Sequence, residues 1–207
     1  LDLIAAGRIG ASGSTASVGI DATTSALLAG AIRGTDIRVA APTINLPAGG
    51  TVGDGTSTQV RLLAGNTNTV AGQVLGGDIR VQGNTILLSG AVGDATSRNV
   101  ALVATGNATV SGNLLGQAIT VGAGVVDLTA AGRIGASGST ASVGIDATAS
   151  ALLAGAIRGS DIRVAAPTIN LPAGGSVGDG TSSLVRLLAG NNATVAGQVL
   201  GADIRVQ

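Results

Sequence analysis

One short pattern recurs ten times along this chain and constrains its fold more than any other feature. Each copy is an apolar residue, a variable residue and a second apolar residue, as in Ile37-Arg38-Val39. In a β-strand such alternation puts both apolar residues on one face and the middle residue on the other. Successive copies begin 19, 23, 19, 21, 19, 24, 19, 23 and 19 residues apart, so tight and loose intervals alternate. The copies begin at Val18, Ile37, Val60, Ile79, Val100, Ile119, Val143, Ile162, Val185 and Ile204.

A second signature, apolar-x-Gly-x-apolar, lies between these strands, as in Val70-x-Gly72-x-Val74. Gly, Asn, Asp, Ser and Thr cluster in the remaining segments, where turns need them. Tandem coils of about twenty residues, each with two or three short strands, are typical of a β-solenoid. The sequence therefore predicts an all-β fold, a right-handed parallel β-helix of about ten rungs of 19–24 residues and roughly 50 Å long. We expect one interior column to contain Ile37, Ile79, Ile119, Ile162 and Ile204, with Val39, Val81, Val121, Val164 and Val206 beside it.

Longer repeats organise these rungs into a single segment, residues 1–207. Residues 1–82 recur as 126–207, an offset of 125 with ten substitutions. Within this super-repeat are modules of about forty residues, at 1–43, 44–85, 86–125, 126–168 and 169–207. Both termini fall inside repeats, so we expect the chain to be an excerpt of a longer solenoid. Its end coils would expose unpaired strands that favour association.

The composition fits a narrow, repetitive core. The chain is 45% hydrophobic but has no Phe, Trp or Tyr, so its interior must be built from aliphatic side chains. This apolar content excludes ordinary disorder, and the apolar runs are too short to span a bilayer. Eleven Arg and eleven Asp give a formal net charge of zero. Such a balance gives no indication of nucleic-acid binding and favours self-association.

The residue types argue against catalysis and against a bound cofactor. The chain has no His, Cys, Lys, Glu or Tyr, which removes the usual bases and nucleophiles. Paired Asp residues can hydrolyse glycosides. Here, however, the Asp residues recur with the repeat, at Asp36, Asp78, Asp161 and Asp203, which indicates a structural role. We expect no enzyme activity and no cofactor.

Two glycine-rich turns, around Asp54 and Asp179, are similar to those of calcium-binding β-rolls. Calcium sites of that kind need several carboxylates and a nine-residue period. Each turn here has one Asp, and the period is about forty residues. The sequence therefore favours a turn role over a metal role.

The middle residues of the ten strands are the most informative surface feature. They form two clusters of three arginines, the arginine ladder: Arg38, Arg61 and Arg80, then Arg163, Arg186 and Arg205. Rungs stacked in register would place neighbouring Arg residues about 5 Å apart, which like-charge repulsion opposes. Asp36 and Asp78 lie two residues before Arg38 and Arg80. One interpretation is therefore a self-neutralised surface, and the other is an anion-binding stripe for sulfated or acidic polysaccharide.

The repeats, with motifs such as Leu63-Ala64-Gly65-Asn66 and Thr69-Val70-Ala71-Gly72, resemble the stalks of filamentous-haemagglutinin-type exoproteins. These are large adhesins exported by two-partner secretion in Gram-negative bacteria. The resemblance extends over the whole chain and implies a right-handed β-helical shaft at the bacterial cell surface, with a role in adhesion, biofilm or contact-dependent killing. It implies no functional residue. We therefore expect a structural extracellular fibre or adhesin stalk that associates with itself, end to end or laterally. The alternative is a shaft that binds host or matrix carbohydrate through its Arg clusters.

Overall fold

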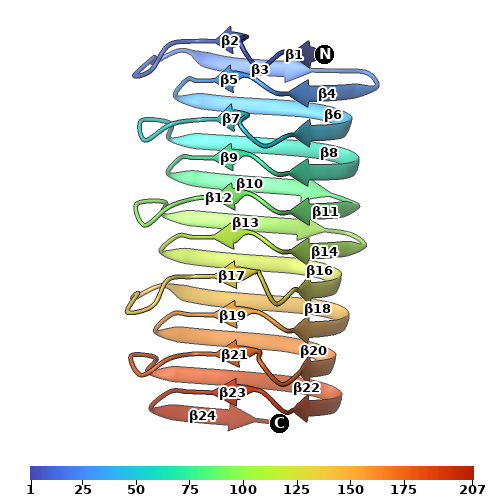
Figure 1. Cartoon of the computed structure of the whole chain (residues 1–207), viewed down its shortest axis with the longest axis vertical. Coiled ribbons are helices and arrows are strands. Elements are labelled where there is room, and N and C mark those ends of the chain that lie inside the picture. The colour runs from blue at the N-terminus through green and yellow to red at the C-terminus, as the bar shows by residue number, and fades with distance from the viewer.

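The computed structural model describes all 207 residues as a parallel β-solenoid of about ten coils (Figure 1). All the strand pairings are parallel, and the structure has no helix. In Figure 1 the distant strands run to the right and the near ones return to the left as the chain descends from its N-terminus, so the winding is right-handed. The predicted fold class is confirmed.

Each coil has three sides. The first and second sides belong to one large sheet, in which six long strands bend from one side to the next: β6 (Asp36–Leu46), β8 (Gln59–Val70), β16 (Ala118–Leu128), β18 (Ser142–Leu153), β20 (Asp161–Leu171) and β22 (Leu184–Val195). In the other coils shorter strands form these sides: β1 (Asp2–Leu3), β3 (Ser17–Asp21), β4 (Ser25–Leu28), β10 (Asp78–Gly83), β11 (Thr85–Leu88), β13 (Asn99–Ala104), β14 (Asn107–Val110) and β24 (Asp203–Val206).

The third side is a separate sheet of ten two-residue strands, one per coil. These strands are β2 (Arg8–Ile9), β5 (Ala31–Ile32), β7 (Thr51–Val52), β9 (Gln73–Val74), β12 (Ala91–Val92), β15 (Asn113–Leu114), β17 (Arg133–Ile134), β19 (Ala156–Ile157), β21 (Ser176–Val177) and β23 (Gln198–Val199). Because each of them presents a single inward side chain, the third side adds one apolar column to the core.

The predicted register of the first side is confirmed. Val60 of β8 pairs with Ile37 of β6 before it and with Ile79 of β10 after it. Ile79 is 3% exposed, and 45 buried residues form one continuous apolar core along the rod. The period-two alternation therefore assigned the inward face correctly, because one side of every strand must be removed from water.

The last coil is an exception to the predicted interior column. Ile204 and Val206 of β24 are 43% and 47% exposed. Both pair in register with β22, through Val185 and Leu187. No further coil covers their other edge in this chain, so residues at interior positions of the pattern remain in contact with water.

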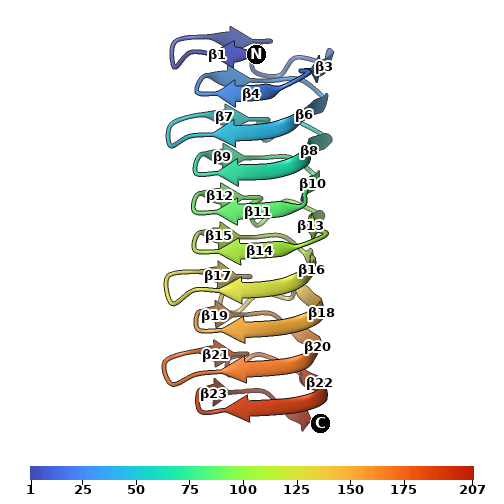
Figure 2. The same ribbon diagram turned by 90° about the vertical axis from the view of Figure 1, so that its right-hand side faces the viewer.

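The second sequence signature forms a corner and not a strand of its own. Val70 ends β8 on the second side and Val74 ends β9 on the third, and both are fully buried. Gly72 lies between them, and a Cβ atom there would be 2.2 Å from the carbonyl oxygen of Gly50 in the coil before. The glycine is required because successive coils approach each other closely at this corner. Figure 2 shows these turns along one edge of the rod.

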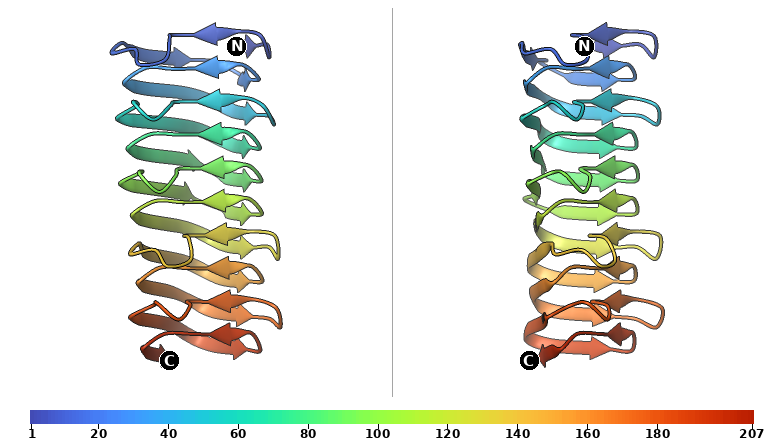
Figure 3. Two further views of the ribbon diagram at one scale, coloured as in Figure 1. Left: turned by 60° about the vertical axis from the view of Figure 1, so that its left-hand side comes forward. Right: turned by 90° about the vertical axis from the view of Figure 1, so that its left-hand side faces the viewer.

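The alternation of tight and loose intervals arises mainly from the links between the third side and the next first side. Residues 33–35 form a short link, whereas residues 53–58, 93–98 and 178–183 form longer loops. Residues 10–16 and 135–141 form the longest of the loops between the third side and the next first side. The long loops occur on every second coil and project along one edge of the rod (Figures 1 and 3). The chain has no helix of the length and apolar character needed to cross a membrane.

Candidate functional site

The arginine ladder has the predicted placement on the outer surface of the first side. Arg61 of β8 pairs in register with Arg38 of β6 and with Arg80 of β10. In the second cluster, Arg186 of β22 pairs with Arg163 and with Arg205. The side chains of each cluster therefore point outward from adjacent coils, as the sequence predicted.

Carboxylates neutralise most of this ladder, and most of the ion pairs run between coils. Arg38 Nη1 lies 2.6 Å from Asp21 Oδ1, and Arg61 Nη2 lies 2.9 Å from Asp36 Oδ1. The second cluster repeats this arrangement, since Arg163 pairs with Asp146 and Arg186 with Asp161. Each of these arginines takes its partner from the strand before it, so stacked like charges are separated by opposite ones.

The carboxylates that lie two residues before Arg38 and Arg80 form ion pairs with other arginines. Asp36 pairs with Arg61, and Asp78 lies 2.6 Å from Arg98 of the following loop. The long guanidinium side chains reach across the 4.8 Å separation between strands more readily than along the strand. Arg80 instead donates from Nε and Nη2 to Gln82 Oε1, at 3.1 and 3.0 Å. Arg80 is the one member of the ladder with no carboxylate partner; Arg205 pairs with Asp203 of its own strand.

The Asp residues of the long loops act within the turns. Asp54 Oδ1 accepts hydrogen bonds from the backbone N–H and the hydroxyl of Thr56, at 2.9 and 2.6 Å. Ser57 then donates from its hydroxyl to the Gly34 carbonyl oxygen, 2.6 Å away in the preceding coil. Equivalent contacts surround Asp94 and Asp179. This geometry explains the glycine-aspartate motif as a turn, in agreement with the role that the sequence favoured.

Asp179 also joins two long loops. Its Oδ2 accepts from the Ser137 hydroxyl at 3.1 Å and from the Gly138 N–H at 3.3 Å, although these residues lie more than forty positions earlier. The hydrogen bonds from the Thr181 hydroxyl and N–H lower the pKa of Asp179 to about 2, with the donors on Gly138 and Ser137 adding to the shift. Thr56 and Thr96 likewise lower the pKa of Asp54 and of Asp94.

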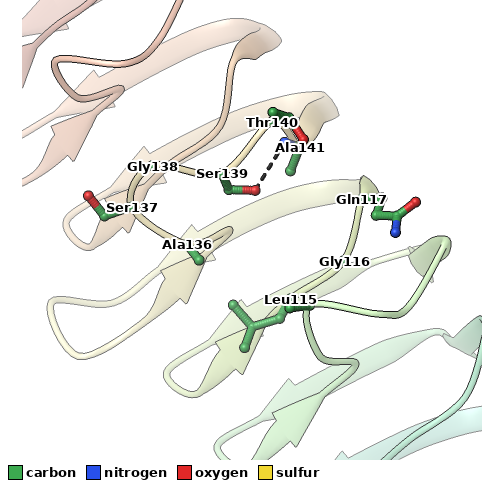
Figure 4. Close-up of a pocket in the computed structure, with 10 residues that line it drawn as sticks. Leu115, Gly116, Gln117, Ala136, Ser137, Gly138, Ser139, Thr140 and Ala141 are labelled. Atoms are coloured by element: carbon green, nitrogen blue, oxygen red, sulfur yellow. Dashed lines mark hydrogen bonds between the residues drawn. The ribbon is translucent and has the colours of Figure 1, made fainter. Parts of the chain in front are cut away.

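Two hollows lie beside the long loop at residues 135–141. One pocket of about 410 Å³ lies beneath the loop at 135–141, with Leu115, Gln117 and Ala141 among its lining residues (Figure 4). A neighbouring cleft of about 220 Å³ shares Leu115, Ala136 and Ser137 with this pocket and contains two arginines, Arg133 and Arg158. The sequence patterns gave no indication of these two arginines. The signal that could have found them is their position at the ends of third-side strands on adjacent coils.

A comparison of the chain with known protein families, curated proteins and solved structures found no match. The class of the protein is therefore defined by its architecture, a parallel β-solenoid repeat.

Proposed function

We propose that this chain is a rod-forming segment of a large bacterial surface protein, a structural extracellular fibre or adhesin stalk. The observation that supports the proposal is the continuity of the core. Forty-five apolar residues form one core that continues through successive coils. Such a repeat adds length in equal steps, because each coil contacts only its neighbours.

The super-repeat supports the same function. The ten substitutions between residues 1–82 and 126–207 leave the strand signature intact, so duplication extends the rod without altering its cross-section. The outward face of the first side carries paired charges, and these keep that face of a long shaft hydrated. Both features suit a spacer that holds another part of a protein away from a surface.

Insertion of one further 125-residue unit tests the mechanical proposal. The unit contains six coils, from Val18 to Val143, so the rod should lengthen by about 29 Å at unchanged diameter. Electron microscopy of the two proteins measures this difference. A thicker or branched particle of unchanged length would contradict the proposal. Surface location is tested separately, by antibody labelling of intact cells that produce the whole protein.

The alternative function, carbohydrate or anion binding by the arginine ladder, has weaker support. Five of its six arginines have a carboxylate within 4.0 Å, and only Arg80 is free of one. A ladder that bound polyanions would lose these ion pairs on binding. Binding of the chain to a glycan array, and its loss in Arg80→Gln but not in Ala101→Gln on the next coil, would favour this alternative.

A further inference from the structure

The distribution of unpaired arginines is uneven. Seven of the eleven arginines have a carboxylate within 4.0 Å, which leaves Arg8, Arg80, Arg133 and Arg158. Two of these four, Arg133 and Arg158, line the same cleft of about 220 Å³, here named the Arg133 cleft. No Asp lines it. The carboxylate nearest to its wall is that of Asp179, which accepts from the Ser137 hydroxyl at 3.1 Å and makes no ion pair with either arginine.

Adjacent coils build the Arg133 cleft. Arg133 of β17 pairs in the third-side sheet with Asn113 of β15 before it and with Ala156 of β19 after it. Arg158 follows directly after β19. Asn113, Arg133 and Ala156 are therefore about 4.8 Å apart from coil to coil, and Arg158 lies two residues beyond Ala156, diagonal to Arg133. The long loop at 135–141 adds Ala136 and Ser137 as a wall.

Arg158 is held in place by one of its nitrogen atoms. Nη1 donates to the Gly178 carbonyl oxygen at 2.6 Å and to the Ser176 hydroxyl at 3.0 Å. Nε and Nη2 of the same guanidinium have no hydrogen-bond partner in the protein. These two N–H groups form the planar edge that binds both oxygens of a carboxylate. Because Nη1 fixes the side chain, little conformational freedom is lost when an anion binds to that edge.

We propose that the Arg133 cleft binds the carboxylate of a sugar acid, such as a uronate residue. Arg158 donates two hydrogen bonds to the carboxylate oxygens, and Arg133 adds a third charge-assisted hydrogen bond. The Asn113 amide can donate to and accept from sugar hydroxyl groups, and Ser137 Oγ, whose hydrogen is donated to Asp179, can accept from one. The cleft is smaller than the roughly 300–1,000 Å³ typical of ligand pockets, so it accommodates one ring at most. Arg133, Asn113 and Ser137 are exposed, and a polymer could therefore present its residues one at a time.

The first copy of the super-repeat provides an internal control. Arg8 and Arg33 are the equivalents of Arg133 and Arg158. Arg33 lies 4.0 Å from Asp54, whereas Arg158 has no carboxylate within that distance. The coil before Arg133 also supplies Asn113 and Leu115 to the cleft. The two arginine pairs have the same charge, but only the second forms this cleft.

Binding to the immobilised 207-residue chain tests the proposal, with galacturonate, glucose, inorganic sulfate and polygalacturonate as the probes. We expect saturable binding of galacturonate and none of glucose. Arg133→Gln should weaken galacturonate binding by about ten-fold, since it removes one charge-assisted contact. Arg158→Lys keeps the charge but loses the planar edge, so it should weaken binding comparably. The control double variant Arg8→Gln/Arg33→Gln should change affinity by less than about two-fold.

Three results would overturn the proposal: no saturable uronate binding, an equal loss in the control pair, or sulfate binding as tight as that of galacturonate. The Arg133 side chain makes no hydrogen bond within the protein, so its variant should retain the circular-dichroism spectrum of the parent chain. If polygalacturonate binds more tightly, per sugar residue, than free galacturonate does, a polysaccharide is the source of the carboxylate. Binding of the monosaccharide alone would identify a free sugar acid.

Discussion

Arg61 donates from Nη2 to the carboxylate of Asp36, whose Oδ1 atom is 2.9 Å away on the preceding strand. This contact passes between two coils, and it is repeated in the second half of the chain by Arg186 and Asp161. The ion pairs therefore join neighbouring coils and offset the repulsion within a stack of three arginines.

The first prediction concerns this pair. Asp36→Asn should destabilise the fold by less than about 1 kcal/mol at low salt, because both side chains are a third or more exposed and water screens the pair. The loss should shrink further in 1 M NaCl, where the Debye length is about 3 Å. A double-mutant cycle with Arg61→Gln, measured by urea unfolding, gives the coupling free energy. A coupling that does not depend on salt would show that packing, not charge, joins the two residues.

The second prediction concerns the core. Ile79 is 3% exposed, and Ile79→Asp would place a carboxylate among apolar side chains with no partner. We expect a loss of about 4 kcal/mol or more, and local unfolding of the neighbouring coils. Thr120→Asp is the matched control, because Thr120 is the exposed middle residue of its strand signature. Denaturation followed by circular dichroism should separate the two, and equal stability would refute the assigned register.

The third prediction concerns the corner glycines. A Cβ at Gly72 would lie 2.2 Å from the Gly50 carbonyl oxygen and 2.7 Å from that of Pro47. Because both obstacles are backbone atoms, Gly72→Ala should cost about 2–3 kcal/mol. A Cβ at Gly122 meets nothing within 4 Å, so Gly122→Ala should be neutral or stabilising by up to about 1 kcal/mol. Thermal unfolding of the two variants compares these outcomes, and a tolerated Gly72→Ala would mean that the coils can separate at the corner.

The fourth prediction concerns acid. The folded-state pKa of Asp179 is lowered to about 2 from its ordinary 3.8, chiefly by the Thr181 hydroxyl and N–H. The ionised carboxylate therefore stabilises the folded state. This contribution is complete above about pH 4 and is lost as the pH falls toward 2. Thr181→Val should raise the pKa of Asp179, and carboxyl carbon NMR during an acid titration measures the shift. An unchanged titration in that variant would show that the Thr181 hydroxyl is not the main donor, because the backbone N–H of residue 181 is retained.

The sequence was sufficient to predict the interior register but not the surface contacts. Ile37, Val60 and Ile79 each begin a strand in which apolar residues alternate with a variable one. Only one stacking register buries all the apolar residues, since a slip by one residue would expose them. The ion pairs depend on side-chain reach between coils, and this is why Asp78 pairs with Arg98 and not with Arg80.

The buried polar side chain of Asn68 and the Arg133 cleft also could not be predicted from the sequence. Asn68 lies in the core between Ile44 and Ile86, where the pattern favours an apolar residue. It is tolerated because its amide donates to the carbonyl oxygens of Leu62 and Gln82, both at 3.1 Å. The Arg133 cleft joins residues 25 positions apart. Its detection needs the knowledge that β17 and β19 are neighbours and that a long loop lies beside them.

The fifth prediction concerns the end coils of the 207-residue chain. The apolar residues Leu1 and Ile4 at one end are 50% and 65% exposed, and Ile204 and Val206 at the other are 43% and 47% exposed. β1, which follows Leu1, and β24, which contains Ile204, each pair with another strand on one edge only. Unpaired strand edges of this kind are templates for further pairing, and a net charge of zero offers little repulsion against it.

The two ends are also compatible in spacing. If one copy followed Gln207 directly, its Val18 would lie at position 225, which is 21 residues after Ile204. The interval from Ile79 to Val100 is also 21 residues and takes the same place in the alternation of tight and loose coils. We therefore expect the strand at Asp203–Val206 of one molecule to pair with the strand at Ser17–Asp21 of another, and the isolated chain to elongate head to tail with rising concentration.

Light scattering over a concentration series measures this elongation, and capped variants establish its direction. A polar capping coil added after Gln207 alone should keep the chain monomeric, because every head-to-tail contact uses that edge. A cap placed before Leu1 alone should do the same. If the cap before Leu1 instead leaves dimers, the C-terminal edges pair with each other. A chain without caps that stays monomeric at high concentration would show that the end coils rearrange to protect their own edges.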